Sequence, residues 1–122
     1  MYKHTATVAG IGLSMLFVVV FFAGRAETRH LAEVAPRVGM NSDDLLAMAP
    51  RVASQTGVTL GTSRRVVYLL ACSGLPTRNT LEEQATLAGS MAKQQRLSDR
   101  EAVSAALVRS GYAAGAGKLK DC

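Results

Sequence analysis

The sequence has no tryptophan and is poor in the other aromatic residues and in histidine. Its 122 residues include three Phe, three Tyr and two His. The histidines, His4 and His30, flank a long apolar segment on opposite sides, so they cannot meet in a metal pair or a catalytic triad. The scarcity of aromatic side chains leaves no platform on which nucleic-acid bases would stack. Composition therefore argues against histidine-based chemistry and against a nucleic-acid partner.

Motifs for phosphate binding and acid–base catalysis are also missing. The sequence before Lys118 falls short of a phosphate-binding loop, because Tyr112 stands where the first glycine belongs and Leu119 where Ser or Thr belongs. Adjacent acidic pairs occur at positions 43–44 and 82–83, where the dipole of a predicted helix start accounts for them. We therefore expect no catalytic, cofactor-binding or metal-binding residues, no cofactor and no enzymatic activity.

Positive charge is in excess but is spread out. The net charge is +5, and residues 63–122 hold nine Lys and Arg against five acids. Apart from the neighbouring Arg64 and Arg65, these basic residues stand singly in the sequence. We interpret them as a solvated basic surface rather than a binding site for an anionic polymer.

One long apolar run dominates the N-terminal part of the chain. Residues 8–24 contain no charged residue. As a helix they would cover about 25 Å, which suits a short membrane span or the apolar core of a signal peptide. The sequence thus predicts that this segment directs the chain to or through a membrane.

Two fates of this segment are open. Gly24 and Ala26 are small residues at the −3 and −1 positions of a signal-peptidase site, which would produce a mature N-terminus at Glu27. However, the apolar run is longer than the roughly 7–15 residues typical of a signal peptide. We therefore favour a retained signal anchor over residues 1–26, with cleavage as the alternative.

The orientation of the anchor rests on competing signals. The order of a short basic head, an apolar core and a small-residue exit is typical of export and favours a periplasmic C-terminal domain. The positive-inside count opposes this, because Lys3 precedes the segment whereas Arg25, Arg29 and Arg37 follow it. We expect a single-pass protein of a bacterial inner membrane with its C-terminal domain in the periplasm.

The remaining residues predict an all-α fold of about four short helices over residues 27–111, followed by a flexible tail over residues 112–122. Capping boxes begin two of the helices, at Thr80 to about Gln95 and at Ser98 to about Ser110. Small and apolar residues form one stripe on each helix. These residues are Leu81, Ala85, Ala88 and Met91 on the first and Ala102, Val103, Ala106, Leu107 and Ser110 on the second.

Less regular segments precede these two helices. Pro36 and Pro50 are predicted to interrupt two short helical pieces, with Ser42 capping the second, and residues 55–62 are predicted to form a turn. The apolar run at residues 64–72 predicts a buried helix ending at Gly74 and forming the centre of the core.

The only cysteines are Cys72 and Cys122. In an oxidising compartment an even number of cysteines favours a disulfide, which would hold the C-terminal tail against the core. The alternative is that Cys72 is a small buried core residue and Cys122 a free or intermolecular thiol.

The predicted layout combines a signal anchor with a small helical outer domain and one disulfide. It is similar to the layout of phage lysis regulators of the antiholin kind and of small accessory subunits of secretion or conjugation machines. It implies a non-enzymatic interaction or assembly subunit whose partners are the membrane and other membrane or periplasmic proteins. The alternative is a cleaved, secreted small binding protein.

The mature N-terminus distinguishes the anchored from the secreted form. We expect the intact mass of the membrane-extracted protein to correspond to a chain that begins at Met1, because the apolar run exceeds the usual length of a signal-peptide core. A mass that begins at Glu27 would establish the secreted form instead.

Overall fold

The computed structural model describes residues 29–74, 78–112, 117 and 119–122. This part of the chain is helical and contains no strand, which confirms the all-α prediction for it. Residues 29–34 form a helical turn that leads into the first named element. The elements are η1 (Ala35–Val38), α2 (Ser42–Thr56), α3 (Leu60–Ser73), α4 (Arg78–Gln95), α5 (Asp99–Arg109) and η2 (Leu119–Asp121).

The proposed anchor at residues 1–26, including His4 and the cleavage site at Ala26, lies outside the described residues. Within the described ranges, no helix combines the length and the apolar character needed to cross a membrane.

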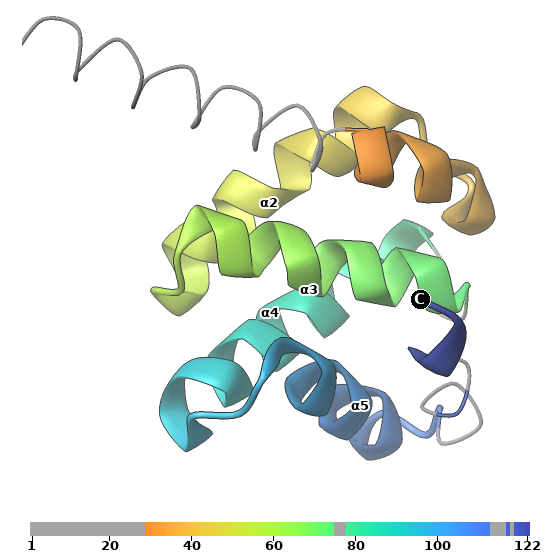
Figure 1. Ribbon diagram of the computed structural model, residues 1–122. Helices are drawn as coiled ribbons and strands as arrows, with labels where there is room; N and C mark the ends of the chain where they lie inside the picture. The colour runs from red at the N-terminus through yellow and green to blue at the C-terminus, as the bar shows by residue number, and fades with distance from the viewer. Residues whose placement is uncertain (1–28, 75–77, 113–116, 118) are drawn as a thin grey trace, which may run out of the picture.

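Helix α3 forms the centre of the fold. It packs against α2, α4 and α5 and against both short 3-10 helices. Figure 1 shows it lying between η1 and α2 on one side and α4 and α5 on the other, with the C-terminus beside its final turn. Val66, Val67 and Leu70 are fully buried within it. The prediction that this run is the core helix is therefore confirmed, although the helix begins earlier than expected, at Leu60.

The core is built largely from small side chains, which allow the helices to approach closely. Leu81, Ala85 and Ala88 of α4 are buried, while Met91 is partly buried. The corresponding stripe of α5 is buried except for Ser110, and it comprises Ala102, Val103, Ala106 and Leu107. The buried hydroxyl of Ser63 donates to the carbonyl oxygen of Ala49 at 2.6 Å, which satisfies a polar group between α2 and α3.

The helix starts follow capping chemistry, with some differences from the prediction. Ser98 caps α5 as predicted, since its side chain accepts from the backbone N–H of Glu101. Helix α2 is capped by Asn41 instead of Ser42, because the longer Asn side chain reaches the N–H of Asp44 at 2.8 Å. Helix α4 begins at Arg78, before the predicted capping residue Thr80.

The predicted interruption of α2 by Pro50 is wrong. Pro50 lies inside the helix at an exposed position. A proline removes one backbone hydrogen bond, but the burial of Met48, Ala49 and Val52 around it holds the turn in place. The helix continues to Thr56, so the predicted turn at residues 55–62 shrinks to the residues between Thr56 and Leu60.

Pro36 does mark a change in the helix, because it lies in the first turn of η1. Proline suits that position, where a backbone N–H has no partner within the helix.

We expect Leu70→Ala to destabilise the fold strongly, because it leaves a cavity beside the centre of α3. Large-to-small substitutions at such buried leucines cost about 2–5 kcal/mol. The matched control is Leu60→Ala on the same helix, where the side chain is 40% exposed and the loss should stay below about 1 kcal/mol. Urea denaturation of both variants measures the difference, and equal losses would contradict the burial of Leu70.

Candidate functional site

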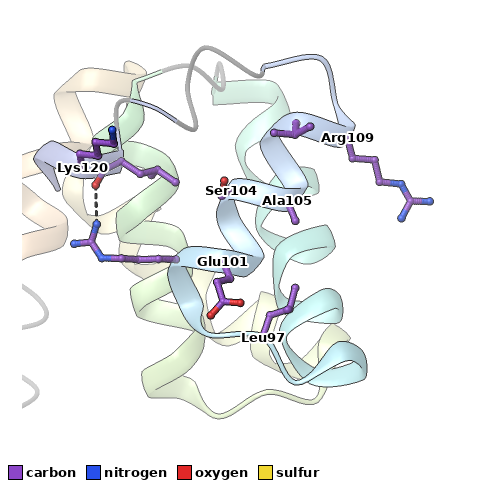
Figure 2. A pocket seen from close by; sticks show the side chains of 9 residues that line it. Leu97, Glu101, Ser104, Ala105, Arg109 and Lys120 are labelled. Atoms are coloured by element: carbon purple, nitrogen blue, oxygen red, sulfur yellow. Dashed lines mark hydrogen bonds between the residues drawn. The ribbon is translucent and has the colours of Figure 1, made fainter.

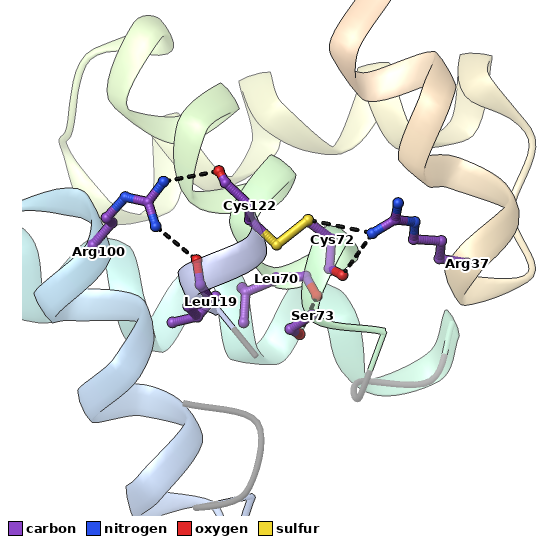
Figure 3. The surroundings of a disulfide bond; sticks show 7 residues. All are labelled: Arg37, Leu70, Cys72, Ser73, Arg100, Leu119 and Cys122. Carbon is purple, nitrogen blue, oxygen red and sulfur yellow. Dashed lines mark hydrogen bonds between the residues drawn. A yellow bond between two sulfur atoms is a disulfide. The ribbon is translucent and has the colours of Figure 1, made fainter. Parts of the chain in front are cut away.

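A disulfide joins the last turn of α3 to the C-terminal turn of the chain. Cys72 and Cys122 are bonded, with their Cα atoms 6.1 Å apart, as the sequence predicts. Figure 3 shows the bond between the end of α3 and η2. The bond closes a loop that contains both α4 and α5, because their residues lie between the two cysteines.

Two arginines from other elements bind to the ends of this disulfide (Figure 3). Arg37 of η1 donates from Nη1 to the carbonyl oxygen of Cys72 at 3.1 Å and to its Sγ at 3.4 Å. Arg100 of α5 donates to the carbonyl oxygens of Leu119 and Cys122, at 2.7 and 2.8 Å. The disulfide therefore lies at a junction of four elements, η1, α3, α5 and η2.

The C-terminal turn also docks by burial. Leu119 is only 4% exposed and belongs to the hydrophobic core, against α3. The Gly- and Ala-rich composition of residues 112–122 predicts a flexible tail and gives no sign of this contact. A single leucine supplies it.

A groove of about 700 Å³ runs between the outer face of α5 and this C-terminal turn. Figure 2 shows Ser104 and Ala105 on the floor, on α5, with Lys120 on the facing turn. The lining residues are Leu97, Arg100, Glu101, Ser104, Ala105, Val108, Arg109, Leu119 and Lys120.

The floor of the groove is the stripe of α5 that faces away from the core. Glu101, Ser104, Ala105 and Val108 are spaced i, i+3, i+4 and i+7, so they share one side of the helix. Val108 is 53% exposed, and it and Leu60 are the large hydrophobic residues that the described part of the chain leaves exposed. The floor is therefore shallow, partly apolar and accessible.

Basic groups outnumber acidic ones at the rim. Arg100, Arg109 and Lys120 line the groove together with a single acid, Glu101. Arg109 extends outward from the end of α5 (Figure 2). The guanidinium of Arg100 is engaged by the backbone oxygens of Leu119 and Cys122, whereas Arg109 and Lys120 line the groove beside it. The groove consequently has a positive field.

A second, smaller cleft lies near the first described residues. His30 and Tyr68 contact each other there, with ring centroids 5.8 Å apart, and Arg65 forms an ion pair with Asp99. The cleft extends to Cys122 and shares Arg100 with the groove. Because Asp99 offsets the charge of Arg65, this cleft is a weaker candidate for binding an anion.

The clefts do not assemble a recognisable reaction centre. In the described ranges, no three His, Cys, Asp or Glu residues lie close enough together to hold a metal ion. Elsewhere, the pKa of the Arg51 guanidinium is raised, because it donates hydrogen bonds to the carboxylate of Glu82 and the negative charge of Glu82 favours its charged form. That pair joins α2 to α4 at the surface.

No protein-family model matches the chain, and comparisons with curated proteins and with solved structures find no match. The candidate site therefore rests on its own geometry.

Sequence reasoning identified the disulfide but missed the groove. One signal was present: Val108 is a large apolar residue on the polar side of a helix whose other side already carries the predicted core stripe. The contribution of Leu119 and Lys120 to the facing wall could not be read from spacing, because it depends on where the tail docks.

We expect Cys72→Ser and Cys122→Ser to destabilise the protein by similar amounts, since each removes the same bond. The sequence separation is 50, and the chain-entropy model gives about 4 kcal/mol for closing a loop of that size. Thermal denaturation measures the loss. A thiol count on denatured, unreduced protein should find no free thiol. Two free thiols per chain, or a dimer that a reductant splits, would contradict the intramolecular bond.

Proposed function

We propose that this protein is a non-enzymatic interaction subunit of a bacterial envelope complex, anchored by its N-terminal segment, with the groove on α5 as its docking site. The single observation that carries the docking role is the partly apolar stripe on the outer face of α5, where Val108 is 53% exposed beside an open groove. An open groove with apolar residues on its floor and charged residues at its rim resembles the surfaces through which proteins bind one another.

The construction of the site supports binding rather than a purely structural role for the C-terminal turn. The turn is fixed by the disulfide, by the burial of Leu119 and by the two hydrogen bonds from Arg100. Because both walls are held in place before binding, less conformational entropy is lost when a partner binds.

The anchor supports the envelope location. The uncharged run at residues 8–24 precedes the folded domain by only a few residues, so the domain would lie close to the bilayer. An oxidised disulfide is typical of the periplasm rather than the cytoplasm. If the segment is cleaved after Ala26, the same groove would serve a secreted binding protein.

Native electrophoresis of detergent extracts from the producing cells tests this function. We expect the protein to migrate in a complex larger than itself, and Val108→Glu to shift it to the smaller free form, because a charge on the apolar part of the floor opposes apolar contact. Leu60→Glu, a charge at the other exposed apolar position, should leave the complex intact. Migration of the wild type as a free monomer would contradict the proposal.

A further inference from the structure

The groove has features that restrict the kind of partner it can receive. Its floor is one helical stripe with the small residues Ser104 and Ala105 at its middle. Small side chains at a contact let a second helix approach closely, at an interaxial distance near the low end of about 8–10 Å. The eleven residues of α5 span about 16 Å, which matches roughly three turns of a docked helix.

Other recognition modes fit poorly. Addition of a strand needs an exposed sheet edge, and the described part of the chain has no strand. Recognition of a proline-rich segment needs an aromatic-lined groove, and none of the residues that line this groove is aromatic. Docking of a helix lays an apolar face against a groove, and the floor of α5 offers Ala105 and Val108 for such a contact.

The charge at the rim selects the chemistry of the partner. Among the described lining residues, Arg109 and Lys120 stand against Glu101, so the groove favours a segment of net negative charge. A second copy of this chain would bring a rim of the same sign to the same place. Repulsion between the two rims therefore opposes self-association through the groove.

We propose that the groove between α5 and the C-terminal turn binds an amphipathic helix of another protein, with an apolar stripe of small and medium-sized residues flanked by Asp or Glu. The apolar stripe lies over Ala105 and Val108, and the acidic flanks lie beside Arg109 and Lys120. This inference rests on the proposed function and adds to it the conformation and charge of the partner.

The test is a peptide display selection against the full chain in detergent micelles. The library contains peptides long enough for about four helical turns, with all residue types allowed. We expect the enriched peptides to combine apolar residues at helical spacing with Asp or Glu beside them, and to become helical on binding by circular dichroism.

Variants then localise the binding site. We expect Val108→Glu to lower the affinity of the selected peptides by about tenfold or more, because it places a charge on the apolar part of the floor. Arg109→Glu should lower the affinity of the peptides and reduce the dependence of that affinity on salt. Leu60→Glu is the matched control and should change neither the affinity nor its dependence on salt. Unchanged thermal stability of all three variants shows that a loss of affinity does not come from unfolding.

The outcomes separate the two proposals. Selection of basic or proline-rich peptides whose binding still depends on Val108 would contradict the proposal of an acidic helical partner but would support the groove as a docking site. Binders that tolerate Val108→Glu and lose affinity with Leu60→Glu would overturn the site. Absence of any enriched peptide, together with a native complex that Val108→Glu does not affect, would overturn both proposals.

Discussion

The arrangement of this domain depends on the covalent bond between Cys72 and Cys122. Helix α3 is the central helix of the fold, and the bond fixes the C-terminal end of the chain to its last turn. Both α4 and α5 lie within the closed loop. Their buried stripes consist mostly of alanine, which buries little apolar area per residue, so the core alone gives these helices modest stabilisation. The disulfide adds stability by restricting the conformations of the unfolded chain, which offsets part of this modest stabilisation from the core.

The same bond makes weak contacts effective. Leu119 alone would hardly compensate the entropy lost when the residues around it become ordered. Once Cys122 is fixed beside α3, however, Leu119 and the carbonyl groups of the turn are already near their partners, and the hydrogen bonds of Arg100 form at little further entropic cost. One wall of the groove thus exists because a distant cysteine at the end of α3 holds it.

The sequence predicts the helices of this domain better than their arrangement. Local chemistry at Ser98 and Gly74 determines where α5 begins and α3 ends, and both were found from residue type alone. The predicted interruption at Pro50 was wrong because the energetic cost of a proline is local, whereas the burial that overrides this cost comes from packing against other helices. The sequence did not predict the groove for a related reason. One wall belongs to a turn that is held by a disulfide and by hydrogen bonds from Arg100 to backbone oxygens, and neither follows from hydrophobic periodicity.

Helix α5 carries apolar residues on its outer side as well as on its inner side. Its inner side carries Ala102, Val103, Ala106 and Leu107, which are fully buried, while Ala105 and Val108 add apolar character to its outer side. A helix at the surface of a monomer ordinarily keeps that outer side polar, and a helix that is apolar on both sides is covered on both sides. Within the described fold, α3 and α4 cover the inner side only. The described residues of the C-terminal turn bound the outer side and leave Val108 exposed, which is the apolar contact that the proposed docking would complete.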